Sequence, residues 1–139
     1  MAQNTGKRSE ERFEEIFSKR GKRVFLYRLP DTAEIRGRAG KGWVRDQPSD
    51  YIVTDDGDTY YSEVKSSQAK VSFSFNQLEK GQRNAAKRQT LAGGKYFIFI
   101  HRLETDEWFK VPAKFFLQLD KKSAKWEELE TFKWALANV

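Results

Sequence analysis

The sequence contains no cysteine and a single histidine in 139 residues. Without cysteine there is no disulfide framework and no metal site built on thiolates. The lone histidine, His101, has no second histidine with which to share a zinc ion, and we expect it to be a strand-end residue without a catalytic role. No apolar run approaches the length of a membrane span, and the N-terminus lacks the apolar core of a signal peptide. These absences predict a cytoplasmic protein.

Positive charge is what the sequence has in excess. Lysine and arginine together number 26, against 20 aspartates and glutamates, so the net charge is +6 and the pI is about 9.5. This balance favours a polyanionic partner, most often nucleic acid. The length suits one domain with a modest core, and we expect residues 1–139 to form a single unit.

The spacing of apolar residues predicts alternating helices and strands. Phe13, Ile16 and Phe17 share one face of a helix expected over residues 9–20. Residues 95–100 are apolar on both faces, which predicts a central strand covered from both sides. Further strands are expected at 23–29, 51–53, 60–64, 71–75 and 108–111, a helix at 76–91, and a C-terminal helical segment over 113–139. This order predicts a mixed α/β fold with a small central sheet flanked by helices.

The candidate catalytic residues lie in a predicted hairpin. Asp56-Gly57 is a strong hairpin-turn signal, and a turn there can bring Asp50 back beside Glu63. Glu63 and Lys65 lie two residues apart on one strand, so their side chains point to the same face. Two carboxylates beside an amine can hold Mg²⁺ or Mn²⁺ and act on a phosphodiester. A lone acid-x-Lys triplet, in contrast, is usually a surface ion pair.

A glycine-rich basic loop, expected over residues 31–47, leads into this hairpin. Its Arg36, Arg38 and Lys41 suit a phosphate backbone, and Trp43 can stack on bases or wedge between them. The alternative is a solvated loop anchored by a packed tryptophan. A second set of candidate DNA contacts, on the helix expected at 76–91, comprises Lys80, Arg83 and Lys87.

The hairpin resembles a known nuclease motif. Asp50 followed by Glu63-Val64-Lys65 is similar to the PD-(D/E)xK motif of metal-dependent nucleases, with one residue inserted between the proline and the aspartate. The resemblance implies that Asp50 and Glu63 are catalytic metal ligands, that Val64 is a further metal-contacting position, and that Lys65 is catalytic. Asp46 is the alternative to Asp50; we favour Asp50 because it opens the strand.

The surrounding segments narrow the resemblance to Holliday junction resolvases. Gly6-Lys-Arg-Ser-Glu10, which opens the first predicted helix, is similar to the start of the archaeal-type resolvases (Hjc). It implies that Glu10 is a metal ligand, with Glu14 as the alternative. The segment 73–82, followed by paired glycines, is similar to the RecU branch of resolvases and implies that Gln82 belongs to the active site.

The resemblance implies a restriction-endonuclease-like fold and a particular activity. A homodimer with two active sites would use Mg²⁺ or Mn²⁺ to nick opposed strands of a four-way DNA junction symmetrically. Two other functions are compatible with the same residues: a nuclease of the restriction, flap or repair type, and a non-catalytic nucleic-acid-binding module. A small stand-alone nuclease suggests a prokaryotic or phage origin.

Overall fold

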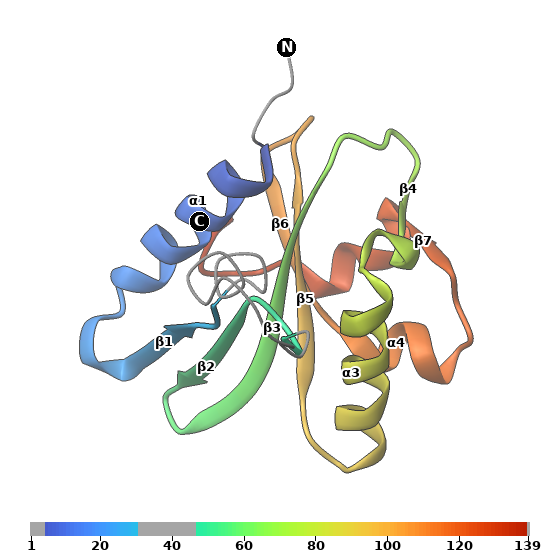
Figure 1. Cartoon of the computed structure of the whole chain (residues 1–139). Helices are drawn as coiled ribbons and strands as arrows, with labels where there is room; N and C mark the ends of the chain where they lie inside the picture. The colour runs from blue at the N-terminus through green and yellow to red at the C-terminus, as the bar shows by residue number, and fades with distance from the viewer. Residues whose placement is uncertain (1–4, 31–46, 139) are drawn as a thin grey trace, which may run out of the picture.

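The structure, a computed structural model, describes residues 5–30 and 47–138 (Figure 1). Five strands form one mixed sheet in the order β1-β2-β3-β5-β6. The first three strands run antiparallel, β3 and β5 run parallel, and β6 lies antiparallel to β5. The bounds are Val24–Arg28 for β1, Tyr51–Asp55 for β2, Asp58–Ser67 for β3, Tyr96–Arg102 for β5 and Glu107–Pro112 for β6.

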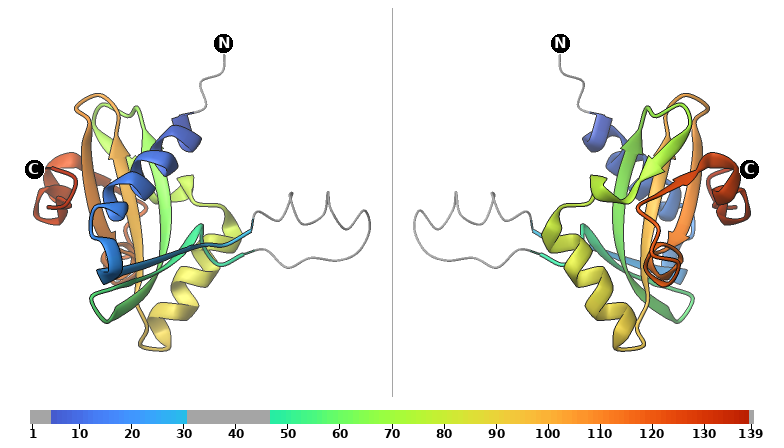
Figure 2. Two further views of the ribbon diagram at one scale, coloured as in Figure 1. Left: turned by 90° about the vertical axis from the view of Figure 1, so that its left-hand side faces the viewer. Right: turned by 90° about the vertical axis from the view of Figure 1, so that its right-hand side faces the viewer.

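Helices cover both faces of this sheet (Figures 1 and 2). Helix α1 (Thr5–Ser18) packs against one face, and α3 (Lys80–Leu91) and α4 (Ala113–Gln118) pack against the other. The parallel connection from β3 to β5 runs through α3, as in a βαβ unit. The remaining described elements are the paired strands β4 (Ser72–Ser74) and β7 (Ser123–Lys125) and the 3₁₀ helices η1 (Gly21–Arg23), η2 (Phe75–Gln77) and η3 (Trp126–Phe132).

Strand β5 lies between two hydrophobic clusters. Phe99 packs against Phe13 and Phe17 of α1, with ring centroids 4.8 and 6.1 Å apart. Its neighbours Ile98 and Ile100 belong to the cluster on the other face, with residues of α3 and α4. All three β5 side chains are fully buried. The predicted central strand covered from both sides is confirmed.

The tight turn between β2 and β3 is also as predicted. Asp56 has a φ of 53° and Gly57 a φ of 89°, and a two-residue type I′ turn requires positive φ at both central positions. The pairing of Asp55 with Asp58 closes the turn. The sheet and its flanking helices confirm the mixed α/β class.

The segment after β4 departs from the helix expected over 76–91. Residues Phe75–Gln77 form η2, and α3 begins only at Lys80. Phe75 stacks on Phe116 of α4 with ring centroids 4.8 Å apart, and Leu78 is fully buried. Burying these two side chains takes precedence over starting the helix earlier, because packing outweighs intrinsic propensity.

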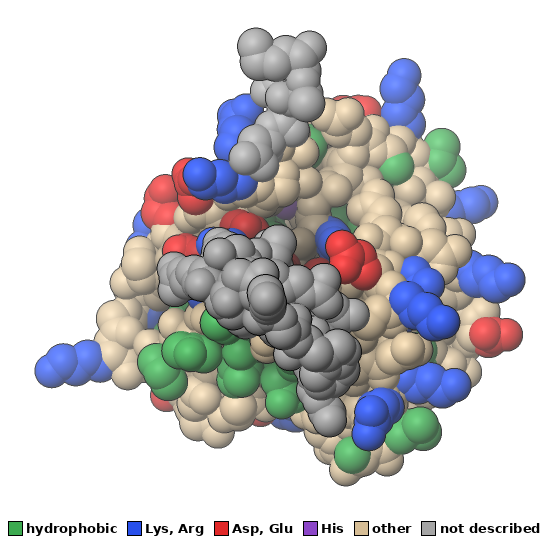
Figure 3. Space-filling model, viewed as in Figure 1, with side chains coloured by type: hydrophobic (Ala, Val, Ile, Leu, Met, Phe, Trp, Pro, Cys, Tyr) green, Lys and Arg blue, Asp and Glu red, His purple; other side chains and the backbone are tan. Residues whose placement is uncertain are grey.

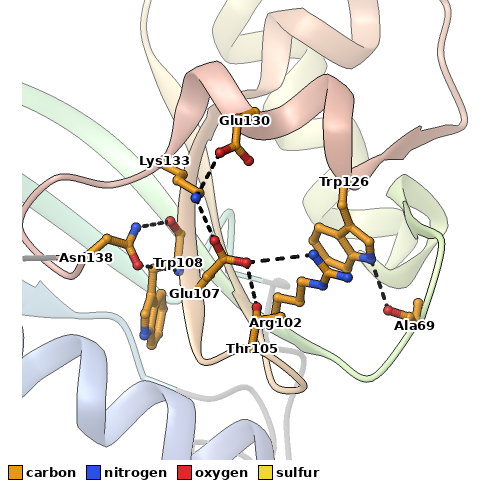
Figure 4. A network of polar contacts seen from close by, with 9 residues as sticks. All are labelled: Ala69, Arg102, Thr105, Glu107, Trp108, Trp126, Glu130, Lys133 and Asn138. Atoms are coloured by element: carbon orange, nitrogen blue, oxygen red, sulfur yellow. Dashed lines mark hydrogen bonds and ion pairs between the residues drawn. The ribbon is translucent and has the colours of Figure 1, made fainter.

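The C-terminal residues are less helical than expected. After α4, a short strand (β7) precedes the 3₁₀ helix η3. The indole N–H of Trp126 donates to the carbonyl of Ala69 at 3.0 Å, and the Arg102 guanidinium lies 4.9 Å from the centroid of its ring (Figure 4). These contacts bind Trp126 to the residues that follow β3 and end β5, and they replace the regular helix that the apolar spacing predicts.

A polar network ties the chain after η3 to β6 (Figure 4). The Lys133 ammonium lies 2.7 Å from the Glu107 carboxylate and 2.9 Å from that of Glu130. Asn138 accepts a hydrogen bond from the backbone N–H of Trp108 at 3.2 Å and donates one to its carbonyl at 2.7 Å. The network therefore holds the C-terminal segment along strand β6.

Two kinds of side chain gather on the surface. Figure 3 shows hydrophobic side chains over β1 and β2, and lysine and arginine side chains over α3. Phe25 is 67% exposed and Tyr27 is 48% exposed, and Ile52 lies beside them. In the part of the chain that the structure describes, no helix is both long enough and apolar enough to cross a lipid bilayer.

Candidate active site

The two carboxylates of the hairpin meet where β2 begins. Tyr51 pairs with Ser62, so Asp50 lies opposite Glu63, the next residue of β3. The Asp50 backbone N–H donates to Glu63 Oε1 at 3.0 Å, and the Val64 backbone N–H donates to Asp50 Oδ2 at 2.9 Å. Each carboxylate is therefore oriented by the backbone of the opposite segment.

Lys65 and Glu10 add further charges to this pair. Lys65 Nζ lies 3.5 Å from Glu63 Oε2, as expected for side chains on the same face of a strand. Glu10 comes from α1, and its Oε1 lies 3.5 Å from Nη2 of Arg28, the residue that ends β1. Three segments far apart in the sequence thus contribute to one group of charged side chains.

These side chains line a cavity of about 260 Å³. A larger hollow of about 820 Å³ adjoins it, shares Glu10, Asp50 and Lys65, and extends past Lys7. Glu14, the alternative to Glu10, instead accepts a hydrogen bond from the hydroxyl of a core tyrosine. The structure therefore brings Glu10, and not Glu14, to the carboxylates of the hairpin.

Gln82 reaches the same cavity from the first turn of α3. Its Oε1 atom is buried and has no hydrogen-bond partner among residues 5–30 and 47–138. A buried carbonyl oxygen without a partner carries a desolvation cost of roughly 1–3 kcal/mol. The atom is therefore available to a water molecule or a cation in the cavity.

Negative charge in the cavity exceeds what its neighbours compensate. Burial, and next the Asp50 carboxylate, raise the pKa of Glu63 from its ordinary 4.5 to about 8, against a smaller opposing effect of Lys65. Burial and then Asp50 also raise the pKa of Glu10, although Arg28 opposes them. Glu63 is only 2% exposed, so water screens this repulsion weakly. An additional cation would stabilise the ionised cluster.

The residue types fit Mg²⁺ or Mn²⁺, which prefer carboxylate oxygens. The described residues contain no three acidic or histidine side chains already arranged to hold a metal. Asp50 and Glu63 each give one oxygen to a backbone N–H, and Glu10 is paired with Arg28. The carboxylates of Glu10, Asp50 and Glu63, and Oε1 of Gln82, are the groups on which a metal would draw.

Comparison with known proteins addresses the fold. No protein-family model and no curated protein sequence matches this chain. Among solved structures, a match is Hjc of Archaeoglobus fulgidus, described as a Holliday junction resolvase from an archaeal hyperthermophile. The TM-score is 0.61 and the sequence identity 14%, over 91% of this chain and 93% of that one.

The chain has the fold of an archaeal Holliday junction resolvase. The resemblance inferred from the sequence is confirmed at the level of the fold, and so is the restriction-endonuclease-like class. At 14% identity the match establishes the architecture and not the activity.

The candidate DNA contacts come from two segments of the sequence, and the structure describes only the one on α3. Lys80 and Lys87 are exposed on α3. Arg83 is turned back toward its own chain, where Nη1 donates to the carbonyl of Leu78 at 2.5 Å, so it holds the segment before α3 in place. The other candidate contacts lie outside the described ranges; they are Arg36, Arg38, Lys41 and Trp43. Asp46, the alternative to Asp50 as a metal ligand, lies outside them as well.

Two residues of the site could not be singled out from the sequence pattern. Arg28 lines both hollows, and its pairing with Tyr51 carries it to the start of β2. The available signal is a charged residue that ends an otherwise apolar strand. Tyr96 donates its hydroxyl to the carbonyl of Pro48 at 2.6 Å and so fixes the chain just before β2. No sequence pattern connects those two positions.

Proposed function

We propose that this protein is a metal-dependent DNA endonuclease that acts on four-way junctions. One observation carries the proposal: in a resolvase fold, four carboxylates line a single cavity together with Lys65 and Gln82, namely those of Glu10, Asp50, Glu63 and Glu79. These groups come from α1, the start of β2, β3 and α3, so the site is more than the ion pair between Glu63 and Lys65. Perturbed carboxyl groups in such a cavity are typical of functional sites.

A division of roles follows from the chemistry of these groups. A bound Mg²⁺ or Mn²⁺ would supply Lewis-acid activation of the phosphodiester and of its attacking water. Lys65, beside Glu63, can orient that water or offset the negative charge that develops on the phosphate oxygens. Gln82 Oε1 can accept a hydrogen bond from water in the cavity and align it. The residues that would hold the metal are Glu10, Asp50, Glu63 and the backbone of Val64.

The basic side chains around the cavity suit a DNA backbone. Lys7 borders the larger hollow on one side, and Lys80 and Lys87 are exposed on α3. The net charge of +6 supports the same partner. Contacts to phosphate position the DNA without reading its sequence, so selectivity would come from the shape of the branch.

We also propose that the protein acts as a homodimer. Paired nicks in opposed strands require two active sites, and the described chain forms one such cavity. A two-fold assembly matches the two-fold symmetry of a four-way junction. The exposed apolar side chains of Phe25 and Tyr27, on the edge strand β1, are the surface that we assign to the contact between copies.

Sedimentation of a surface variant tests this assembly. Phe25→Glu places a charge in the assigned contact and should shift the protein from dimer to monomer. Val71→Glu changes an apolar residue that is 64% exposed on another part of the surface, so it should leave the mass unchanged. A parental protein that sediments as a monomer on its own and on a junction would contradict the dimer.

The activity is tested with purified protein, Mg²⁺ and three labelled substrates: a four-way junction, a flap and a plain duplex. Paired symmetric nicks confined to the junction support the proposed function. Cleavage of the flap or the duplex as well would favour a nuclease of the restriction or repair type. Binding without cleavage, unchanged in Glu63→Ala, would leave a non-catalytic DNA-binding module as the better description.

A further inference from the structure

The start of helix α1 is held to the sheet through one buried polar side chain. The buried residues of α1 are Ser9, Phe13, Ile16 and Phe17, of which Ser9 is the nearest to the N-terminus. Its Oγ atom lies 2.9 Å from Nδ1 of His101, at the end of β5. Ser9 is 1% exposed, so this contact is shielded from water.

His101 is itself fixed from two sides. Its ring stacks on the indole of Trp108, with centroids 4.4 Å apart and planes at 8°. Its Nε2 lies 2.7 Å from Oδ1 of Asp106, in the turn between β5 and β6. With the proton on Nε2 shared with that carboxylate, Nδ1 is left to accept the hydrogen bond that the Ser9 hydroxyl donates.

This Ser9–His101–Asp106 chain has the composition of a catalytic triad, but its geometry does not allow nucleophilic attack. Ser9 is only 1% exposed and its hydroxyl is engaged by His101 Nδ1, whereas the Asp106 side chain is 81% exposed. In a catalytic triad the serine must be accessible to the substrate, whereas here the serine is buried and the aspartate is exposed. The chain is better suited to holding the helix than to attacking a bond.

Little else packs beneath the first turns of α1 on this side. A hollow of about 660 Å³ lies between them and the end of β5, and Ser9, His101 and Asp106 line it together with Thr5, Arg8 and Leu103. The contact between the Thr5 and Ser66 hydroxyls measures 3.5 Å, at the long limit for a hydrogen bond. Ser9 and His101 therefore form the one short polar contact under the first turns of α1 on this side, in addition to the packing of Phe13, Ile16 and Phe17 further along the helix.

We propose that His101 is a positioning residue for the metal site, acting through Ser9 on Glu10. The two helix residues are adjacent, so their side chains project about 100° apart around the helix axis. A helix start that is pinned by Ser9 against β5 directs Glu10 toward Asp50 and Arg28. The inference rests on the proposed function, because it concerns the metal that Glu10 would help to hold.

The Mg²⁺ concentration that cleavage requires distinguishes a positioning role of His101 from a general contribution to stability. His101→Ala should raise the Mg²⁺ concentration for half-maximal junction cleavage by about tenfold, as loss of a residue that orients a metal ligand does. The rate at saturating Mg²⁺ should stay near the parental value. His101→Asn keeps an acceptor near the position of Nδ1 and should restore most of the affinity. Ser9→Ala should reproduce His101→Ala, and the double variant should add little.

The matched control is Lys121→Ala, which removes an ion pair of 2.6 Å with Glu128 and touches neither the Ser9–His101 contact nor Trp108. It should lower the melting temperature without changing the Mg²⁺ requirement. The Mg²⁺-induced rise in melting temperature, measured without DNA, provides a readout that needs no cleavage. It should shrink in His101→Ala and Ser9→Ala only.

The outcomes distinguish the two proposals. A parental protein that neither cleaves junctions nor gains thermal stability from Mg²⁺ contradicts the proposed function. A parental protein that does both, with an unchanged Mg²⁺ requirement in both His101→Ala and Ser9→Ala, overturns the role of His101 alone. If His101→Ala does not fold, Ser9→Ala gives the same decision.

Discussion

Two acidic clusters in this molecule are built from the same residue types and differ in how well their charges are matched. In the C-terminal network, the Glu107 carboxylate lies 2.7 Å from Lys133 Nζ and 3.7 Å from Arg102 Nη1 (Figure 4). In the cavity, the Glu63 carboxylate has one lysine at 3.5 Å and the charge of Asp50 nearby. The first cluster balances its charge, and the second does not.

The pKa values of the two glutamates accordingly shift in opposite directions. A hydrogen bond from Lys133 is the main cause that lowers the pKa of Glu107. Burial is the main cause that raises the pKa of Glu63 to about 8. A network with matched charges stabilises the contact between two segments. A network with excess negative charge, in contrast, is suited to binding a cation. The comparison therefore agrees with a structural role for Glu107 and with the functional role that we propose for Glu63.

The largest effect is expected from the lysine in the cavity, Lys65, and the lysine of the C-terminal network, Lys133, serves as its control. Lys65→Ala should slow junction cleavage by about a hundredfold or more, because a group that assists proton transfer or charge development is lost. Binding of the junction should be nearly intact. Single-turnover cleavage and gel-shift binding measure the two quantities. Lys133→Ala, in the balanced network, should cut at close to the parental rate; equal losses in both variants would remove the distinction.

The next effect concerns the ligand on α1. Glu10→Gln should raise the Mg²⁺ concentration for half-maximal cleavage by about tenfold or more, since a metal-contacting carboxylate is replaced by a weaker neutral ligand. Glu11→Gln is the matched control, because Glu11 is the exposed neighbour on the same helix. Mg²⁺ titrations of both variants decide the matter. Identical titration curves for the two would show that Glu10 takes no part in metal binding.

The pH dependence of stability should differ between the clusters. The pKa of Glu63 is raised in the folded protein, so its contribution to stability is fully present below pH 4.5 and is lost as the pH rises toward 8. Glu63→Gln should flatten the fall of the melting temperature over this window in metal-free buffer. Mg²⁺ should restore stability to the parental protein at high pH and do little for the variant. Parallel curves for the two proteins would contradict the raised pKa.

The smallest effect is expected at Glu107. Its pKa is lowered, so its contribution to stability is present above pH 4.5 and is lost as the pH falls through the lowered value. Glu107→Gln should reduce the free energy of unfolding at neutral pH by about 1 kcal/mol or less, because the pair is partly open to solvent. Urea unfolding at neutral and acidic pH measures both the size and the sign. A Mg²⁺-dependent change here would be unexpected.

Local signals in the sequence were sufficient for the hairpin. Asp56-Gly57 specifies a type I′ turn, and the alternation of residues along a strand then determines that Glu63 and Lys65 share a face. The family resemblance suggested Glu10 and Gln82, which the fold brings to the same cavity. These inferences work because they depend on short segments whose geometry follows from the residues themselves.

The contacts that depend on distant packing were not predictable in this way. Arg28 joins the site through the register of β1 on β2, and Tyr96 through a hydrogen bond to Pro48. Trp126 does not form the expected helix but contacts Ala69, in the segment after β3, and Arg102, at the end of β5. His101, expected to be a strand-end residue without a catalytic role, is the penultimate residue of β5, and its hydrogen bond to Ser9 joins residues 92 positions apart.

The packing of Trp134 against α1 has a consequence for folding during synthesis. Its indole packs against Phe13 and Phe17 of α1, with ring centroids 5.6 and 5.0 Å apart, and against Phe99 of β5. Contacts between segments so far apart in the chain require the closure of a long loop, which costs conformational entropy. During synthesis, the helix that carries Glu10 therefore cannot complete its packing until Trp134 has left the ribosome. A nascent chain that already contains every acidic residue of the cavity would still lack a firmly seated α1.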